Sequence, residues 1–269
     1  MGGAVLITFR EVLEAALIIG IILGYLAKVG ENRLARYVWW GTGLALLASA
    51  VTGYLFEVLA GGFEGRSEEI FEGVVMLVAV GILTSMILWM QRQSRTIKGE
   101  IQARVDQAIG GNTVASIAIF AFVSVFREGA ETMLFLKAAL VSGTQQGVFV
   151  GGLAGILGAV LIAWLVFKNA IRLDIRKFFV VTGTLLLLVA AGLFAHGIHE
   201  LQEAAVLPTI IEHVWDINFI LDEKGLIGSF LKALFGYDGN PSLLEVLAWI
   251  SYLAFFGTKY VLAVGQPRN

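Results

Sequence analysis

The sequence lacks cysteine entirely and contains few charged residues, histidines and prolines. Without cysteine the chain forms no disulfide, no thiolate metal site and no thiol redox centre. A net charge of -2, with no block of like charges, argues against nucleic-acid binding. Only 15% of the 269 residues are charged, whereas soluble domains contain about 25%. The composition therefore argues against a soluble globular protein.

Apolar residues and glycine are abundant instead. Hydrophobic residues make up 58% of the chain, against about 45–50% in soluble domains, and this excess indicates that the lipid bilayer is the solvent. The 32 glycines are typical of closely packed membrane helices. The N-terminus lacks a basic region, and its apolar stretch is interrupted by Arg10, Glu11 and Glu14. The sequence therefore predicts a retained first span rather than a cleaved signal peptide.

Seven segments are apolar over the roughly 20 residues that a membrane-spanning helix needs. The loops after the first, third and fifth segments are basic, and the others are acidic or uncharged. By the positive-inside rule the basic loops face the cytoplasm, the N-terminus lies outside and the C-terminus inside. We therefore predict an all-α, multi-pass integral membrane protein of the cell membrane, inner or plasma. Its seven transmembrane helices are expected at residues 3–27, 37–60, 70–91, 114–141, 147–168, 177–199 and 243–265.

A six-residue motif occurs twice, as Phe-Arg-Glu-Val-Leu-Glu at residues 9–14 and Phe-Arg-Glu-Gly-Ala-Glu at residues 126–131. The copies fall on the first and fourth spans, which cross the membrane in opposite directions. The sequence therefore predicts two inverted three-helix repeats plus one additional helix, in a single membrane domain. Its predicted parts are repeat one (1–91), a cytoplasmic amphipathic linker (92–113), repeat two (114–199), an outer interfacial segment (200–242), and the seventh helix with its tail (243–269).

Both motifs place charged side chains near the middle of a span, where an ionised residue costs about 2.5–3.5 kcal/mol. Charges at that depth face the bundle interior and mark functional sites. Inverted repeats bring their substrate site to the bilayer midplane, and residues three or four apart share a helix face. The sequence therefore predicts a cation site at the midplane. Its metal ligands are expected to be Glu11, Glu14, Glu128 and Glu131, supported by Arg10 and Arg127.

The chemistry of such an all-oxygen site suits hard cations such as Mg, Ca, Mn or oxidised iron. A trivalent ion would offset four carboxylates most effectively, and the arginines can hold the glutamates when no ion is bound. The alternative is that the motifs form two buried salt bridges that lock the helices together. Apolar residues would achieve that contact more cheaply, which favours the metal site.

Two further polar clusters are predicted near the outer face. An acidic cluster at the start of the third span can gather cations before they enter, or it is a solvated helix start favoured by the helix dipole. A second cluster ends the sixth span at helical spacing, where imidazole suits iron or zinc, or it is an ordinary polar helix end. The acidic cluster consists of Glu68, Glu69 and Glu72, and the weaker candidates are His196, His199, Glu200 and Glu203.

The doubled Arg-Glu-x-x-Glu motif resembles the oxidase-dependent iron transporter family, which comprises the fungal high-affinity iron permease and its bacterial relatives. Residues 68–73 (Glu-Glu-Ile-Phe-Glu-Gly), 181–183 (Val-Thr-Gly) and 199–203 (His-Glu-Leu-Gln-Glu) resemble it too, so the likeness covers nearly the whole chain. Fungal members read Arg-Glu-Gly-Leu-Glu. This chain has Val12 for the glycine in its first copy and Ala130 for the leucine in its second, with every charged position intact.

This resemblance implies a permease, not an enzyme, that imports iron as Fe³⁺ through the six charged positions of the two motifs. Iron is then the transported substrate rather than a cofactor. The resemblance also implies a partner, an oxidase or an extracytoplasmic protein that delivers iron. One alternative is a proton-coupled transporter of another divalent cation, such as Fe²⁺, Mn²⁺ or Pb²⁺. A metal-dependent membrane oxidoreductase subunit is the other, but the three histidines offer few ligands for it. No sequence feature predicts an oligomeric state.

Overall fold

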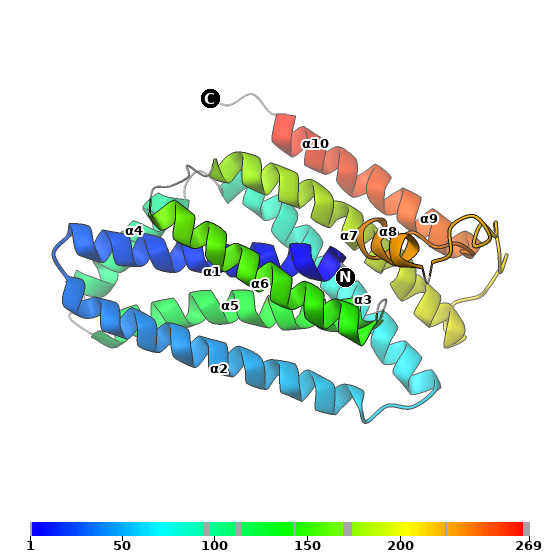
Figure 1. Cartoon of the computed structure of the whole chain (residues 1–269), viewed down its shortest axis with the longest axis horizontal. Coiled ribbons are helices and arrows are strands. Elements are labelled where there is room, and N and C mark those ends of the chain that lie inside the picture. Colours follow the sequence, from blue (N-terminus) through cyan, green and yellow to red (C-terminus); the bar gives the residue numbers. More distant parts are fainter. Residues whose placement is uncertain are drawn as a thin grey trace.

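The computed structural model describes residues 2–93, 97–110, 114–141, 144–168, 174–223 and 225–265. Every regular element in these ranges is a helix, which confirms the all-α prediction, and the long helices run side by side in an elongated bundle (Figure 1). The long elements are α1 (Gly2–Lys28), α2 (Ala35–Ala60), α3 (Arg66–Gln93), α5 (Val114–Val141), α6 (Gln145–Phe167) and α7 (Ile175–Glu203). A last stretch joins α9 (Leu243–Tyr252), the π-helical turn η2 (Leu253–Gly257) and α10 (Thr258–Gly265); the short elements are η1 (Asn32–Leu34), α4 (Ile97–Gly110) and α8 (Leu226–Phe235).

Five helical stretches among the described residues are long and apolar enough to cross a membrane. Of the seven predicted spans, α1 and α5 are not among these five, although they contain 27 and 28 residues. Each carries the three charged residues of one copy of the motif inside its apolar run. The seven-span count and the orientation therefore stay predictions. The five stretches are Asn32–Leu59, Arg66–Met90, Gln145–Phe167, Lys177–Glu203 and Leu243–Val264.

The two kinds of loop lie at opposite ends of the bundle (Figure 1). One end holds η1 and α4, with Arg33, Arg36 and Arg104, and is called the basic end below. The other end holds the α2–α3 loop, the segment after α7 and α8, with Glu64 and Glu68, and is called the acidic end. This separation matches the alternation of charge along the sequence, and by the positive-inside rule it predicts that the basic end faces the cytoplasm.

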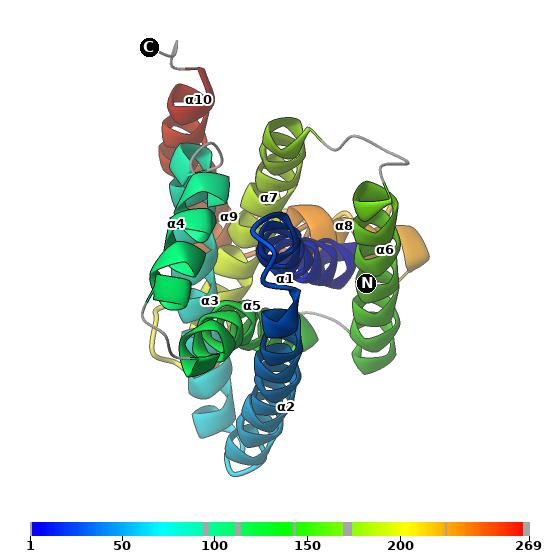
Figure 2. The same cartoon turned by 90° about the vertical axis from the view of Figure 1, so that its left-hand side faces the viewer.

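The helices pair across the predicted repeats. α1 packs most extensively on α6, α2 on α5, and α3 on α7, with α1 near the middle of the bundle in the end-on view (Figure 2). In the predicted repeats α1 corresponds to α5, α2 to α6 and α3 to α7. The α1–α6 pair is therefore equivalent to the α5–α2 pair, and the α3–α7 pair is equivalent to itself. This is the packing expected of two inverted repeats whose helices interleave.

Small residues allow these close pairings. Gly155 of α6 leaves no room for a Cβ atom against the backbone of Val5 on α1, and Gly41 of α2 leaves none against Ala118 on α5. Both glycines belong to stripes of small buried residues spaced four apart. The stripes are Gly41, Ala45 and Ser49 on α2, and Gly151, Gly155 and Ala159 on α6, each 110 positions later.

The short helix α4 lies at the basic end with its apolar side against the bundle. Ile101 and Val105 are buried in a cluster with Ile22 of α1 and Ile117 of α5. The sequence predicts a cytoplasmic amphipathic linker here, and the structure places the apolar side of α4 against the bundle itself. Part of the predicted linker 92–113 lies outside the described residues.

At the acidic end, the chain after α7 folds back over the bundle. The Tyr237 hydroxyl donates a hydrogen bond to the Leu221 carbonyl at 2.8 Å, which joins the segments before and after α8. Trp249 Nε1 donates to the Phe235 carbonyl at 2.9 Å, which joins the end of α8 to α9. Together with α1, α6, α7 and α9, this segment encloses a cavity of about 1190 Å³. We call it the acidic-end cavity.

Candidate metal site

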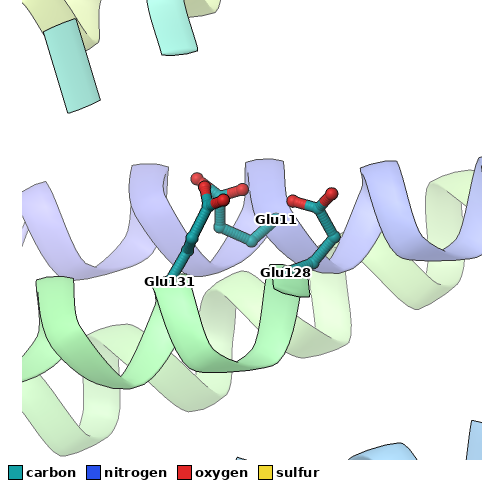
Figure 3. Close-up of side chains that lie close together, drawn as sticks. All are labelled: Glu11, Glu128 and Glu131. Carbon is teal, nitrogen blue, oxygen red and sulfur yellow. The ribbon is translucent and has the colours of Figure 1, made fainter. Parts of the chain in front are cut away.

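The two copies of the charged motif face each other between α1 and α5. Glu11 of α1 and Glu128 and Glu131 of α5 each place a carboxylate oxygen within 4.8 Å of the other two (Figure 3). Glu11 and Glu128 are buried and Glu131 is partly buried. Ligand atoms that share an ion at about 2.0–2.2 Å lie roughly 3–4 Å apart, so this group needs little adjustment to hold one.

One oxygen in each of these three glutamates is buried without a hydrogen-bond partner among the described residues, namely Oε2 of Glu11, Glu128 and Glu131. Buried polar atoms are normally paired, because an unpaired one costs about 1–3 kcal/mol and a charged one more. Glu14 Oε1 is likewise without a hydrogen bond, although it lies close to Arg10. Carboxylates that approach one another and keep oxygens free of donors are suited to share one positively charged ligand. A cation is such a ligand, whereas a hydrogen-bond donor would satisfy only one or two of the oxygens.

Arg10 is enclosed at the same level, with 2% of its side chain exposed. Its Nε lies 2.8 Å from Glu14 Oε1 and its Nη1 3.2 Å from Glu11 Oε1. The guanidinium also contacts the thioether sulfurs of Met86 and Met90 on α3. Sequence reasoning missed both methionines, because they belong to an apolar span; their spacing of four residues was the only available signal.

Glu14 occupies a different position from the other three carboxylates. The structure does not place it in the group within 4.8 Å, although the sequence predicts it as a fourth ligand. It is buried, pairs with Arg10, and lies about one helical turn from Glu11 toward the basic end. Glu14 therefore adjoins the group of three on the side nearer the basic end.

Arg127 holds the equivalent place in the second motif but has other surroundings. Its Nη2 donates to Glu128 Oε1 at 2.8 Å, and its Nε lies 3.5 Å from Glu131 Oε1. The guanidinium carbon also lies 5.6 Å from the centre of the Trp89 ring, a cation–π arrangement that the sequence did not predict. Its side chain is 48% exposed. Both motifs thus neutralise their glutamates with an arginine, but only the second arginine is accessible.

A pocket of about 250 Å³ explains that exposure. Its walls include Glu14, Arg127 and Glu128 at the site, and Glu100 and Arg104 of α4 at the basic end. It therefore links the carboxylate group with the basic end of the bundle, and we call it the basic-end pocket.

Toward the acidic end the site is closed. Ile7 and Phe135 lie one helical turn beyond Glu11 and Glu131 in that direction, and neither side chain is exposed. Both belong to one buried apolar cluster, which includes Leu186 of α7. Within the described residues, the buried apolar layer therefore separates the site from the acidic end, and the basic-end pocket leads to it from the other.

The acidic cluster predicted as an outer entrance lies at the start of α3. Glu68 is exposed, and Glu69 and Glu72 are partly buried. The structure does not bring them into the carboxylate group between α1 and α5, and they belong to the acidic end.

The weaker candidates at the end of α7 are brought together in pairs. His196 Nε2 lies 3.5 Å from Glu200 Oε1, and His199 Nε2 lies 3.3 Å from Glu203 Oε1. Glu245 of α9 adds a contact that sequence reasoning missed, with its Oε1 3.1 Å from His199 Nδ1. The Ser-x-x-Glu pattern of the α9 capping box was the available signal for this glutamate.

Comparison with known proteins gives consistent matches along the chain. The Iron permease FTR1 family matches residues 1–265. A ferrous iron permease EfeU from Yersinia pestis is 34% identical over 250 residues, which cover 92% of this chain and 89% of that protein. A protein of the same name from Escherichia coli O6:H1 is 35% identical, with 92% of this chain and 91% of that protein covered. No solved structure matches the chain significantly.

Proposed function

This chain belongs to the Iron permease FTR1 family, and on that premise we propose that it imports Fe²⁺ through the carboxylate group between α1 and α5. Glu11, Glu128 and Glu131 are the ligands in this proposal, and Glu14 receives the ion on its way to the basic end. The observation that carries it is the set of three buried oxygens that lack partners within the described residues, one from each glutamate.

Family membership settles several predictions made from the sequence. The resemblance to iron permeases is confirmed, and so is the expectation of a transporter rather than an enzyme. Iron is the transported substrate of such a permease. The family, together with five apolar helices of membrane-spanning length, makes this a multi-pass membrane protein.

The oxidation state is the part of the proposal that departs from the sequence-based prediction of Fe³⁺. Relatives at 34% and 35% identity are named ferrous iron permeases. The charges at the site support a divalent ion as well. Four glutamates and two arginines leave two negative charges when all are ionised, and Fe²⁺ neutralises them fully. Oxygen ligands also accept this ion, since carboxylates bind hard and borderline cations alike.

Direction and delivery follow from the predicted orientation. With the basic end in the cytoplasm, an ion enters at the acidic end, crosses the apolar layer of Ile7 and Phe135, and leaves through the basic-end pocket. A protein outside the membrane that oxidises or delivers iron remains a prediction from the family resemblance.

Uptake into proteoliposomes tests this function. We would compare Fe²⁺ kept reduced with ascorbate, Fe³⁺ citrate, Mn²⁺ and Pb²⁺. The variant carries Glu11→Gln and Glu131→Gln, which preserve volume but remove two ligand charges. Its matched control is Glu57→Gln on α2, whose side chain is 71% exposed and lies outside the site. We expect saturable Fe²⁺ uptake in the wild type and control, and at least a tenfold loss in the double variant.

The other results point elsewhere. Equal uptake by the double variant and the control would mean that the motifs are structural salt bridges. Uptake of Fe³⁺ but not Fe²⁺, still lost in the variant, would keep the site and overturn the proposed oxidation state. Proton-driven Mn²⁺ uptake without competition by iron would favour the alternative transporter.

A further inference from the structure

The acidic-end cavity carries metal-binding side chains of its own, on the far side of the apolar layer from the carboxylate group. His196 of α7 and Glu245 of α9 are both on its wall. The rings of His196 and His199 are stacked, with their centres 5.6 Å apart and their planes at 13°. Two histidines and several carboxylates therefore lie near one another at the acidic end as contacting pairs, although no three of their ligand atoms come as close together as those of Glu11, Glu128 and Glu131.

Each histidine is paired with the glutamate one helical turn later. The separations are 3.5 Å for His196 Nε2 to Glu200 Oε1 and 3.3 Å for His199 Nε2 to Glu203 Oε1. Two ligand atoms that share an ion at about 2.0–2.2 Å lie roughly 3–4 Å apart. Each pair therefore has the spacing of two neighbouring ligands of a metal ion, and side-chain rotation would bring the two pairs onto the same ion.

Glu245 gives His199 the orientation of a metal ligand. Its carboxylate lies 3.1 Å from Nδ1, on the opposite side of the ring from Nε2 and Glu203. Metal-binding histidines usually have such a carboxylate on the second nitrogen, which fixes the tautomer and leaves the first nitrogen as the ligand. Glu245 is itself held in place, since it is buried and accepts a hydrogen bond from the backbone of Ser242 at 3.1 Å.

A purely structural role accounts for only part of this arrangement. The His199–Glu245 contact joins α7 to α9, and such a link could be the whole reason for that histidine. His196 is different, because its carboxylate partner Glu200 is on its own helix and the pair ties no second helix to α7. His196 is partly buried on a cavity wall, and its ring stacks on His199, which Glu245 orients. These are features of a metal ligand rather than of a residue that only links two helices.

The N-terminal part of α3 brings further negative charge to the same end. Gly73 packs against the Gly197 carbonyl and Leu201 of α7, with no room for a Cβ atom. This contact brings the part of α3 that carries Glu72 against the part of α7 that carries Glu200. Cations are thus drawn to this part of the acidic end by carboxylates of both helices.

We propose that His196, His199, Glu200 and Glu203, with His199 oriented by Glu245, form a second metal site that binds divalent transition metals at the acidic-end cavity. Imidazole and carboxylate together suit Fe²⁺, Co²⁺ and Zn²⁺, in contrast to the all-oxygen group between α1 and α5. The second site selects these ions over Mg²⁺ and Ca²⁺ before they reach the transport site. This deepens the proposed function and rests on it only for the direction of ion movement.

Binding of Co²⁺ to the purified full-length protein in detergent tests the inference. Co²⁺ stands in for Fe²⁺ because it does not oxidise in air and its visible spectrum reports nitrogen ligands. The background is a Glu11→Gln, Glu128→Gln, Glu131→Gln variant, in which the transport site is removed. To it we add either His196→Gln with His199→Gln or, as the matched control, His213→Gln, which changes the remaining histidine in an exposed part of the acidic end.

We expect one Co²⁺ per chain in the background and in the control, and at least tenfold weaker binding when both cluster histidines are replaced. Adding Glu245→Gln should weaken binding about 10- to 100-fold, as for other carboxylates that orient a ligating histidine. In the unmodified protein, Co²⁺ should protect His196 and His199, but not His213, from diethylpyrocarbonate, which needs no variant to fold.

Several results would overturn the inference. They are no Co²⁺ binding in the background, equal loss in the His213→Gln control, or no protection of the two histidines. If the background variant binds no Co²⁺ while the wild type binds one ion, the second site is refuted and the proposed transport site stands. Conversely, one bound ion in both wild type and background would keep the second site and count against metal binding at the carboxylate group.

Discussion

Arg10 and Arg127 occupy the same position in the repeated motif, yet they compensate their glutamates in different surroundings. Arg10 is 2% exposed and is enclosed by two carboxylates and two thioethers. Arg127 is 48% exposed and borders the basic-end pocket. A buried charge that loses its partner is strongly destabilised, whereas water takes over much of that role at an accessible position. The two arginines should therefore respond differently to the same substitution.

We predict that Arg10→Gln destabilises the protein by about 3–5 kcal/mol, because it leaves the buried Glu11 and Glu14 without compensation. Arg127→Gln should cost clearly less stability and act mainly on iron uptake. Thermal unfolding in detergent, measured beside proteoliposome uptake, separates the two effects. Arg33→Gln is the control, since Arg33 forms an ion pair at the surface, is 80% exposed and should contribute less than about 1 kcal/mol. Equal unfolding temperatures for the Arg10 and Arg127 variants would contradict this prediction.

Sequence reasoning singles out the charged residues of the two motifs because a charge inside an apolar span is conspicuous, and the structure brings three of their glutamates together. It does not predict Met86 and Met90, whose side chains are indistinguishable in sequence from the rest of an apolar helix. Nor does it separate Glu14 from the other glutamates, because helical spacing places residues on one face but does not set the depth at which the partner helix meets that face. Glu245 is missed for another reason: its contact with His199 depends on how α9 docks on α7.

Among the helices, the α1–α6 and α2–α5 pairs depend on small residues at the contact. At Gly155, a Cβ atom would meet backbone atoms of Val5 and Phe9, which cannot move aside without shifting α1. At Gly24, by contrast, nothing lies within 4 Å of that position. Glycine is therefore required for packing at the first site, while at the second it only weakens the helix.

Replacing each glycine with alanine should consequently change stability in opposite directions. We predict that Gly155→Ala lowers the free energy of unfolding by about 1–3 kcal/mol through overpacking. Gly24→Ala should be neutral or raise it by as much as about 1 kcal/mol, as expected for glycine in a helix interior. Denaturant unfolding of both variants in the same detergent provides the comparison. Stabilisation by Gly155→Ala would show that α1 and α6 do not pack as closely as the structure has them.

Most helices were predictable because long apolar runs set their limits. The first span was expected at residues 3–27, and α1 is Gly2–Lys28; the fourth was expected at 114–141, and α5 is Val114–Val141. The π-helical turn Leu253–Gly257 inside the last span was not predicted. The segment that contains α8 was expected at the outer interface, but the way α8 folds back over the bundle was not predicted. Both depend on contacts between distant segments, which the period of a single helix does not report.

For the molecule as a whole, the surroundings of the carboxylate group differ between its two ends, and the inverted repeat relates the residues on one side to those on the other. Ile7 and Phe135 close the acidic side. Their counterparts in the other repeat, 117 positions away, are Ser124 and Ile18, and both line the open basic-end pocket. Equivalent residues thus form a closed layer on one side and an open path on the other. Exchanging the conformations of the two repeats would open the acidic side and close the basic side, which is how inverted repeats give alternating access.

The absence of cysteine allows this arrangement to be tested with single-cysteine variants and a membrane-impermeant thiol reagent. In inside-out vesicles we expect Ser124→Cys to react at least ten times faster than Phe135→Cys, because only the first lines an open pocket. Asn32→Cys at the basic end should react in the same vesicles, and Glu64→Cys at the acidic end only in intact cells, which fixes the orientation. Reaction of Ser124→Cys from the same side as Glu64→Cys would mean that the site opens outward, or that the positive-inside rule misassigns the ends. If iron transport proceeds by exchange of the two repeats, adding Fe²⁺ should slow the labelling of Ser124→Cys, because molecules that carry the ion across spend part of each cycle with the basic-end pocket closed.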